Sequence, residues 1–317
     1  AHANAGDYAI TCSGASDDNY DFTYTPGTLT IDPLPVIVTL TPSSKQYDGN
    51  TTTSIASCAV SVPTLSCTGA PATGTFGDPN VGTAKTVTAN APGLGLSGPG
   101  ASNYVVTQVI VVPADITPRP ATVTAGGGTK MFGTADMPFS SVTSAGFLPA
   151  DLASITFAQS RLAGEDVGSY AVNALASGAV TSNYRITYVP GAFTITRAPA
   201  LITIPSASKV YDGNTNATLT GCSVNIGGLS CTSAPTTGAF SDKNVGTGKT
   251  VTATTTGIGL SGTNAANYYV AGVTVTPANI TAKPLTITAN NVTKTYGQTV
   301  TFTGAEFTTS GLVAGDS

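Results

Sequence analysis

Residues 103–124, NYVVTQVIVVPADITPRPATVT, contain the pattern that decides the fold. An Asn-Tyr pair opens an apolar run, a proline follows, and the segment Thr117-Pro118-Arg119-Pro120 comes shortly afterwards. Directly behind it begins a new alternating segment, Ala121-Thr122-Val123-Thr124. Alternation of apolar and polar residues is typical of β-strands. Since proline fixes φ and restricts the residue before it, we expect one strand to run through a short, stiff connection into the next.

This pattern recurs along the whole chain of 317 residues. The motif Tyr47-Asp48-Gly49-Asn50-Thr51 returns as Tyr211-Asp212-Gly213-Asn214-Thr215, and we call the step from Tyr47 to Tyr211 the long period. The Asn-Tyr pairs divide the long period into nearly equal halves, and they lie at Asn19-Tyr20, Asn103-Tyr104, Asn183-Tyr184 and Asn267-Tyr268. Such self-similarity indicates a repeat architecture. We expect complete modules at 33–117, 118–196 and 197–281, with parts of modules at 1–32 and 282–317.

Each module is expected to be all-β. Clusters of Gly, Pro, Asn and Ser separate short alternating segments such as Lys85-Thr86-Val87-Thr88-Ala89, and Pro149–Ala153 is compatible with a single helical turn. Several short strands in about 80 residues favour a small two-sheet sandwich of the Ig-like kind. With stiff connections, the modules are expected to form a tandem array arranged end to end as a rod.

The composition excludes several other classes of protein. Charged residues make up 9% of the chain, with 12 Lys+Arg against 16 Asp+Glu, 36 Gly and 20 Pro. Helix bundles need more Leu, Glu, Lys and Ala, and a nucleic-acid surface needs a basic patch. No apolar run approaches the roughly 20 residues of a membrane helix. Residues 1–6 lack the basic and apolar parts of a signal peptide, although a secreted protein could have lost one.

Two cysteine pairs recur after one long period. Cys58 and Cys67 are nine positions apart, and so are Cys222 and Cys231. A hairpin with a four-residue loop, Ser61–Thr64 or Asn225–Gly228, would bring each pair together, so we expect two disulfides, each stabilising a thin module by about 2–3 kcal/mol. Disulfides would place the protein outside the cytoplasm. Cys12 is left over, and a zinc site is disfavoured because there is no CxxC and the only histidine is His2.

Other motifs have both a functional and a structural interpretation. Gly93–Gly98 and Gly257–Gly262 fit G-x-G-x-x-G, but no helix follows, so we interpret them as loops between strands. Asp48-Gly49-Asn50 and Asp212-Gly213-Asn214 offer oxygen atoms for Ca²⁺ but are also ordinary turn sequences, which we favour.

The Asn-Tyr pairs and the recurring lysines are open to two interpretations as well. Each Tyr is expected to fill the sandwich while its Asn bonds a nearby turn, rather than to bind a ligand. Lys45, Lys85 and their copies Lys209 and Lys249 are interpreted as a solvated strand face, with a covalent Lys-Asn crosslink as the alternative. Catalysis finds no support, since a lone His2 makes no triad and Glu165-Asp166 lies in a turn without a second copy. We expect no enzyme activity, no cofactor and no metal.

At this point a family resemblance becomes visible. Tyr47–Thr51 with Asn80–Val87, and again Tyr211–Thr215 with Asn244–Val251, resemble the YDG repeat. The module between them resembles the MBG repeat, which Gly6–Ile10 and Tyr296-Gly297-Gln298 also match in part; its motifs are Pro120 to Phe132-Gly133, Gly168–Val172, Asn183-Tyr184 and Pro190–Ile195. Such repeats are similar to those of large bacterial surface proteins, notably filamentous-haemagglutinin-like adhesins exported by two-partner secretion. The resemblance implies an extracellular stalk and no transferable active site.

We therefore expect a structural stalk or filament segment of a secreted bacterial adhesin or matrix protein, located at the cell surface. Its partners would be neighbouring modules of the same chain or like filaments, with no nucleic acid and no membrane insertion in this segment. Two alternatives stay open: a module that binds carbohydrate or matrix, and a polymerising filament subunit joined by strand complementation. The partial modules at the two ends are expected to reflect a slice of a longer array.

Overall fold

The computed structural model describes residues 3–317, which divide into two compact units. Unit 1 comprises the described residues up to Gly126 together with Ser141–Ser160 and Val172–Gly191. Unit 2 comprises Gly127–Ser140, Arg161–Ala171 and Ala192–Ser317. Within residues 3–317 the regular secondary structure consists of strands, one short α-helix and three 3₁₀ turns, so the all-β prediction is confirmed. None of the helices in residues 3–317 has the length and apolar character needed to cross a membrane.

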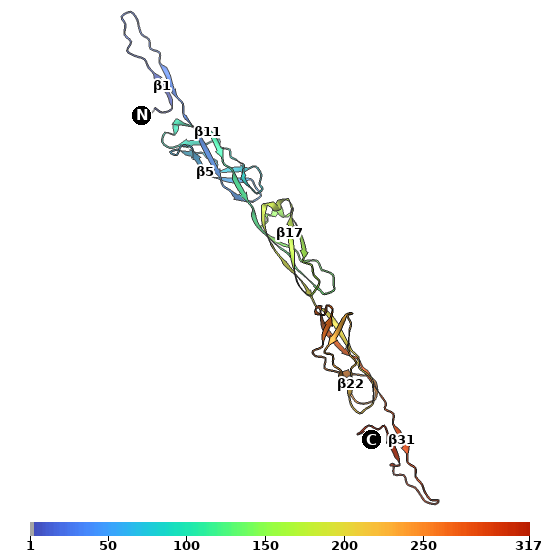
Figure 1. Ribbon diagram of the computed structural model, residues 1–317. Coiled ribbons are helices and arrows are strands. Elements are labelled where there is room, and N and C mark those ends of the chain that lie inside the picture. The colour runs from blue at the N-terminus through green and yellow to red at the C-terminus, as the bar shows by residue number, and fades with distance from the viewer. Residues whose placement is uncertain (1–2) are drawn as a thin grey trace. The chain divides into compact units, whose positions relative to one another are not determined.

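The first complete module, which lies in unit 1, has ten short strands, among them β5 and β11 (Figure 1). The strands are β3 (Leu34–Pro42), β4 (Lys45–Gln46), β5 (Thr52–Val60), β6 (Ser66–Thr68), β7 (Thr73–Phe76), β8 (Gly82–Lys85), β9 (Val87–Thr88), β10 (Gly95–Ser97), β11 (Tyr104–Val111) and β12 (Ala114–Thr117). They form sheets of order β11-β3-β5-β7-β9, β4-β12-β8 and β10-β6. The first strand, β3, is parallel to β11, which follows the Asn-Tyr pair.

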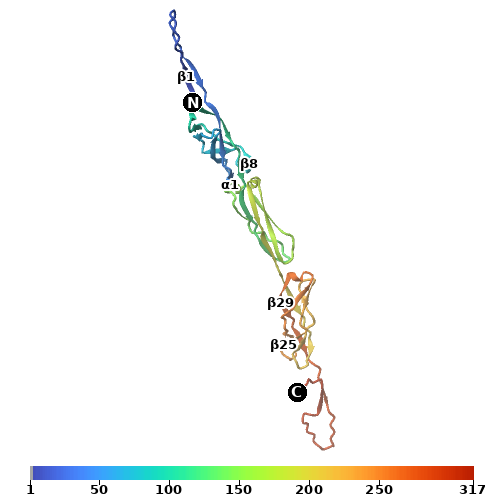
Figure 2. The ribbon, with the colours of Figure 1, turned by 60° about the vertical axis from the view of Figure 1, so that its left-hand side comes forward.

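Unit 1 also holds the strands that precede and follow this module. The antiparallel hairpin of β1 (Gly6–Ile10) and β2 (Gly27–Ile31) comes first. After the module come β13 (Arg119–Thr124), β15 (Thr143–Ala145), α1 (Pro149–Leu152) and β18 (Tyr184–Val189), together with the parts of β16 (Thr156–Arg161) and β17 (Gly168–Ser177) that precede Arg161 and follow Ala171. Strand β13 lies between β15 and β18, and Figure 2 shows α1 close to β8. The single helical turn expected near Pro149 is therefore confirmed.

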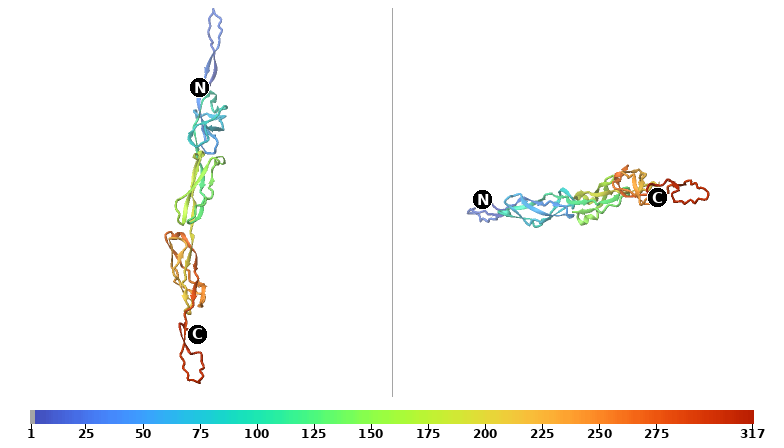
Figure 3. Two further views of the ribbon diagram at one scale, coloured as in Figure 1. Left: turned by 90° about the vertical axis from the view of Figure 1, so that its right-hand side faces the viewer. Right: turned by 90° about the horizontal axis from the view of Figure 1, so that it is seen from below.

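Unit 2 repeats this plan. Its strands are β14 (Gly128–Met131), β19 (Gly191–Thr196), β20 (Ala198–Ile204), β21 (Lys209–Val210), β22 (Asn216–Thr218), β23 (Ser223–Val224), β24 (Leu229–Thr232), β25 (Thr237–Phe240), β26 (Gly246–Lys249), β27 (Val251–Thr252), β28 (Gly259–Gly262), β29 (Tyr268–Val275), β30 (Ala278–Thr281), β31 (Thr286–Ala289) and β32 (Phe307–Ser310). Strand β20 is parallel to β29, as β3 is to β11. The hairpin of β31 and β32 follows β30 at the end of unit 2 (Figure 3).

In the first strand of each YDG-type module every second side chain points into the core. In β20 buried and exposed residues alternate over the whole strand, with Ile202 and Ile204 inside. The corresponding Val38 and Leu40 of β3 are fully buried. Their cross-strand partners are β-branched or small residues, which pack well on a pleated surface. In unit 1 the buried cluster includes Phe76 of the first module and Phe147 behind the connection, so it is continuous between the two modules.

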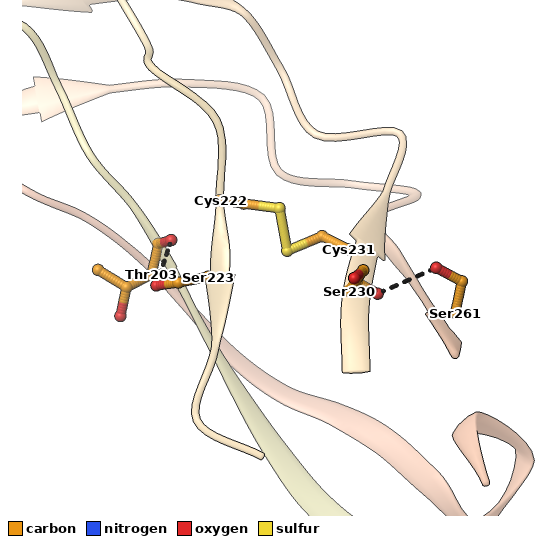
Figure 4. Close-up of a disulfide and its surroundings, with 6 residues drawn as sticks. All are labelled: Thr203, Cys222, Ser223, Ser230, Cys231 and Ser261. Atoms are coloured by element: carbon orange, nitrogen blue, oxygen red, sulfur yellow. Dashed lines mark hydrogen bonds between the residues drawn. A yellow bond between two sulfur atoms is a disulfide. The ribbon is translucent and has the colours of Figure 1, made fainter. Parts of the chain in front are cut away.

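Two disulfides join Cys58 to Cys67 and Cys222 to Cys231, as expected. The expected hairpin geometry, however, is wrong. Cys58 lies on β5, which pairs with β3, whereas Cys67 lies on β6, which pairs with β10. In the second copy, Cys222 precedes β23 and Cys231 lies on β24, which pairs with β28 (Figure 4). The Cys58–Cys67 disulfide therefore connects two different sheets of its module, and the Cys222–Cys231 disulfide joins the residue before β23 to β24. Cys12 is free and exposed.

Candidate functional site

The connection between modules in unit 1 is one residue long. Strand β12 ends at Thr117 and β13 begins at Arg119, so only Pro118 separates the last strand of one module from the first strand of the next. Strands β19 and β20 are likewise separated by Arg197 alone. Both connections have little freedom, because the flanking residues are held in strand ladders, and in the first of them proline also fixes φ. The surfaces on either side are thereby brought into contact.

Aromatic side chains fill the junction in unit 1. The ring of Tyr47, from the first module, meets the ring of Tyr184 edge to face, with centroids 5.4 Å apart. Tyr184 also packs against Phe147 at 4.7 Å. Both tyrosines are buried, and such pairs stabilise by about 0.5–1.5 kcal/mol beyond area burial. The junction is therefore a packed core and not a flexible tether.

Asp151 binds both tyrosine hydroxyls at this junction. The Tyr47 hydroxyl donates to Asp151 Oδ2 at 3.0 Å, and the Tyr184 hydroxyl donates to the same oxygen. The Tyr184 oxygen in turn accepts the Leu148 N–H at 3.0 Å. Burial and the neighbouring Asp151 carboxylate raise the pKa of Tyr184 to about 12 and also raise the pKa of Tyr47, so both hydroxyls stay protonated as donors at neutral pH.

A buried asparagine completes the junction. Asn183 is 2% exposed. Its Oδ1 accepts the Val81 N–H at 2.9 Å, and its Nδ2 donates to Asn80 Oδ1 at 3.0 Å. Asn80-Val81-Gly82 is the loop that opens β8 in the preceding module. We call this pair of hydrogen bonds the Asn clasp, because one side chain satisfies both a main-chain donor and a side-chain acceptor across the junction.

The Asn clasp is present at two further junctions. Asn103 accepts the Ala5 N–H at 2.7 Å and donates to Asn4 Oδ1 at 3.1 Å. Asn267 accepts the Val167 N–H at 2.8 Å and donates to Asp166 Oδ1 at 2.8 Å. The receiving loop always has the form Asn or Asp, then any residue, then Gly, and lies 98 to 103 residues before the clasping asparagine. The clasping asparagine belongs to a module with a disulfide at Asn103 and Asn267 and to the module between them at Asn183, so both module types form the clasp.

The Asn-Tyr pairs thus have a different role from the one expected. Tyr184 is buried, as expected, whereas Tyr20 is 72% exposed, so the expectation is wrong there. In the other three pairs the asparagine bonds the preceding module rather than a nearby turn. Glu165-Asp166, which the sequence analysis set aside as a turn, contains the acceptor for Asn267. The signal was present in the sequence, since each of these loops shares the Asn/Asp-x-Gly form with Asn80-Val81-Gly82.

The Asp-Gly-Asn turns hold a lysine. Lys45 Nζ lies 2.7 Å from Asp48 Oδ1, 2.9 Å from Asn50 Oδ1 and 2.9 Å from the Thr52 carbonyl oxygen. In the second copy Lys209 Nζ binds Asp212 Oδ1 and Asn214 Oδ1 at 2.7 and 2.9 Å, and the hydrogen bond from Lys209 lowers the pKa of Asp212. The lysine ammonium group donates hydrogen bonds to the oxygen atoms that would have to bind Ca²⁺ in a calcium site. This favours the interpretation of the motif as a structural turn.

The other candidate residues are the second pair of recurring lysines, the G-x-G-x-x-G segments and the possible metal ligands. Lys85 and Lys249 form ion pairs with Asp78 and Asp242 at 2.8 and 2.6 Å. The G-x-G-x-x-G segments contain strands β10 and β28 and no helix. Within residues 3–317 no group of three or more His, Cys, Asp or Glu side chains is placed to hold a metal ion, and His2 lies outside the described residues.

A charge cluster in unit 2 was missed by the sequence analysis. Lys130, whose side chain is 3% exposed, pairs with Asp136 at 2.7 Å and with Glu165, and Arg161 pairs with the same two carboxylates. The guanidinium also lies 5.2 Å from the centre of the Phe193 ring, within the range of a cation–π contact. Hydrogen bonds from Arg161 and then Lys130 lower the pKa of Asp136 to about 2.

This cluster predicts a loss of stability in acid. Because the pKa of Asp136 in the folded chain is below its ordinary value of 3.8, the stabilisation is complete above about pH 5 and is lost as the pH falls from about 4 to 2. The melting temperature of the chain, followed by circular dichroism, should fall over this interval, and Asp136→Asn should flatten that part of the profile. Asp18→Asn, at an exposed position outside the cluster, should leave the profile unchanged. Equal flattening by both variants would contradict the assignment.

Fold and junctions together define a tandem array of small β-modules connected strand to strand. The YDG domain model matches residues 32–110 and 196–276, more than half of the chain, and the chain belongs to this family. The MBG domain (YGX type) matches residues 1–30 and 121–194, so domains of the two kinds alternate. No curated protein and no solved structure matches the chain.

Proposed function

We propose that the chain is a structural stalk or filament segment of a secreted bacterial adhesin or extracellular matrix protein. In this proposal Ig-like sandwiches lie end to end as a rod, outside the cytoplasm, and the protein performs no catalysis. The observation that carries it is the Asn clasp, which recurs at three junctions with the same atoms. A repeated contact of this kind, whose asparagine is buried at Asn183 and Asn267, keeps each module at a fixed angle to the next, which an extended support requires.

The other features support the same role. The junction core of Tyr47, Phe147 and Tyr184 removes the free hinge that a mobile linker would supply. The two disulfides each close a segment within a thin module that buries little apolar surface, and such disulfides suit an oxidising, extracellular location. The partners in this proposal are neighbouring modules or like filaments.

Small-angle X-ray scattering tests the proposal. A compact chain of this length has a radius of gyration of about 20 Å. We expect at least twice that value, with a cross-section that stays narrow and constant along the particle. A radius near that of a compact chain, or a broad distribution of shapes that indicates mobile hinges, would overturn the proposal.

A further inference from the structure

The receiving loop of the Asn clasp in unit 1 is held by an ion pair of its own module. Asp78 Oδ1 accepts the Asn80 N–H at 2.8 Å, and Asp78 Oδ2 accepts a hydrogen bond from Lys85 Nζ, also at 2.8 Å. Asn80 in turn offers its side-chain oxygen to Asn183. The Asp78 carboxylate therefore connects Lys85 to the residue that receives the clasp.

The stem of Lys85 also packs over the glycine of this loop. The Lys85 side chain is 14% exposed. A Cβ at Gly82 would lie 3.1 Å from Lys85 Cδ and 3.2 Å from Lys85 Cγ, closer than side chains normally approach one another. The glycine of the receiving loop thus makes room for the lysine three positions later, and the two residues form one structural unit.

The second YDG-type module repeats this unit. The Asn244 N–H donates to Asp242 Oδ1 at 2.8 Å, and Lys249 Nζ donates to the same oxygen at 2.6 Å. A Cβ at Gly246 would lie 3.3 Å from the stem of Lys249. Since Asn183 clasps the first loop and the second loop has the same internal contacts, these contacts form independently of Asn183.

The charges of the two loops are arranged in the same way. The hydrogen bond from Lys85 and, after it, that from the Asn80 N–H lower the pKa of Asp78. The corresponding bonds from Lys249 and from the Asn244 N–H lower the pKa of Asp242. Both carboxylates therefore stay ionised at neutral pH, and each remains an acceptor for the main chain of its loop.

The receiving loop of the MBG-type module is held by an arginine instead. Arg161, whose side chain is 9% exposed, donates through Nη1 to the Gly164 carbonyl oxygen at 2.6 Å and through Nη2 to the Glu165 carboxylate. The next two residues, Asp166-Val167, receive the clasp of Asn267. The guanidinium thus fixes the chain directly before the two clasped residues.

We propose that a charged side chain presets the receiving loop of the Asn clasp, namely Lys85 through Asp78 for Asn183 and Arg161 for Asn267. Both are positioning residues, because they act through the loop that the asparagine binds. A loop that is already ordered loses less conformational freedom when the clasp forms. This inference rests on the proposed function and deepens it, since it names the residues that set how firmly the modules are joined.

Hydrogen exchange of the Val81 N–H, measured by NMR, tests the role of Lys85. In Lys85→Met the apolar stem stays and the ammonium group is lost, so Asp78 no longer has its anchor. We expect the Val81 N–H, which donates to Asn183 Oδ1, to exchange about tenfold faster, the effect of losing a hydrogen bond to a charged group. Lys249→Met, the matched control, removes the same ion pair from the second copy and should change this exchange by less than about twofold.

A double-mutant cycle separates positioning from a general structural role. In the Asn183→Ala chain the loop has no clasp to receive, so adding Lys85→Met should change the exchange of the Val81 N–H by less than about twofold. Three results would overturn the inference: no effect of Lys85→Met, an equal effect of Lys249→Met, or a tenfold effect that persists in Asn183→Ala. Scattering reports the shape of the whole particle and exchange reports one loop, so this inference and the proposed function can fail separately.

The second arm of the experiment concerns Arg161. Arg161→Lys keeps the positive charge of the cluster but loses the planar fork that reaches Gly164 and Glu165 together. The Val167 N–H should then exchange about fivefold faster when Asn267 is present, and by less than about twofold in the Asn267→Ala chain. Unchanged exchange of the Val167 N–H in Arg161→Lys, or an equal change in both chains, would contradict the assignment of Arg161.

Discussion

Tyr184→Ala should open the junction in unit 1 at a cost of about 3 to 5 kcal/mol in local stability, the range for a large buried aromatic side chain. The variant removes the ring that packs on Tyr47 and Phe147, takes one of the two hydroxyl donors from Asp151 and leaves the Leu148 N–H without its acceptor. Hydrogen exchange reports such local opening, and it can be measured by mass spectrometry on peptides covering β12 and β13. Exchange there should become at least a hundredfold faster, since about 1.4 kcal/mol corresponds to a factor of ten.

Tyr20→Ala is the matched control for this experiment. The two tyrosines follow an asparagine at equivalent places of the same module type, but Tyr20 is exposed. Its removal should change exchange in β12 and β13 by less than twofold, since exposed substitutions away from special features have small effects. If Tyr184→Ala behaves like Tyr20→Ala, the junction carries no stability and the modules are independent.

Much of the fold could be predicted from local patterns. The alternation in Leu201–Ile204, the prolines of the connections and the long period are all local or periodic features, and they indicate strands, short connections and repeated modules. The disulfide pairs were predicted because their spacing repeats. Their placement between sheets was not, since sequence separation does not reveal which strand pairs with which, and β6 pairs with β10 rather than with the neighbouring β5.

The junction contacts were harder to predict for a physical reason. An asparagine is compatible with a nearby turn or a distant loop, and only the fold brings Asn183 to Val81, 102 residues away. In the charge cluster Lys130 also meets Glu165, 35 residues away, and Arg161 meets Asp136, 25 residues away, so the local sequence does not indicate the network around the buried Lys130. Long-range polar contacts of this kind depend on topology rather than on composition.

The chemical nature of the acceptor in each clasp loop predicts how much stability an Asn→Asp substitution of the clasping residue costs. Asn183 donates to Asn80, an amide, whereas Asn267 donates to Asp166, a carboxylate. In Asn183→Asp the new carboxylate keeps the Val81 N–H, and Asn80 can rotate its amide to become the donor. In Asn267→Asp the two facing groups are both carboxylates, and neither has a proton to give at neutral pH. We therefore expect a cost of about 1 kcal/mol at Asn183 and about 3 kcal/mol at Asn267.

Hydrogen exchange of the clasp loops distinguishes these outcomes. The Val167 N–H donates to Asn267 Oδ1, and its protection against exchange should fall about a hundredfold in Asn267→Asp. The protection of the Val81 N–H should fall less than tenfold in Asn183→Asp. Lowering the pH to about 4 should restore part of the protection at Val167, because one of the two carboxylates then takes up a proton and becomes a donor. A cost that is equal at both junctions, or that does not change with pH, would show that the clasp works through shape and packing and that its hydrogen bonds contribute nothing.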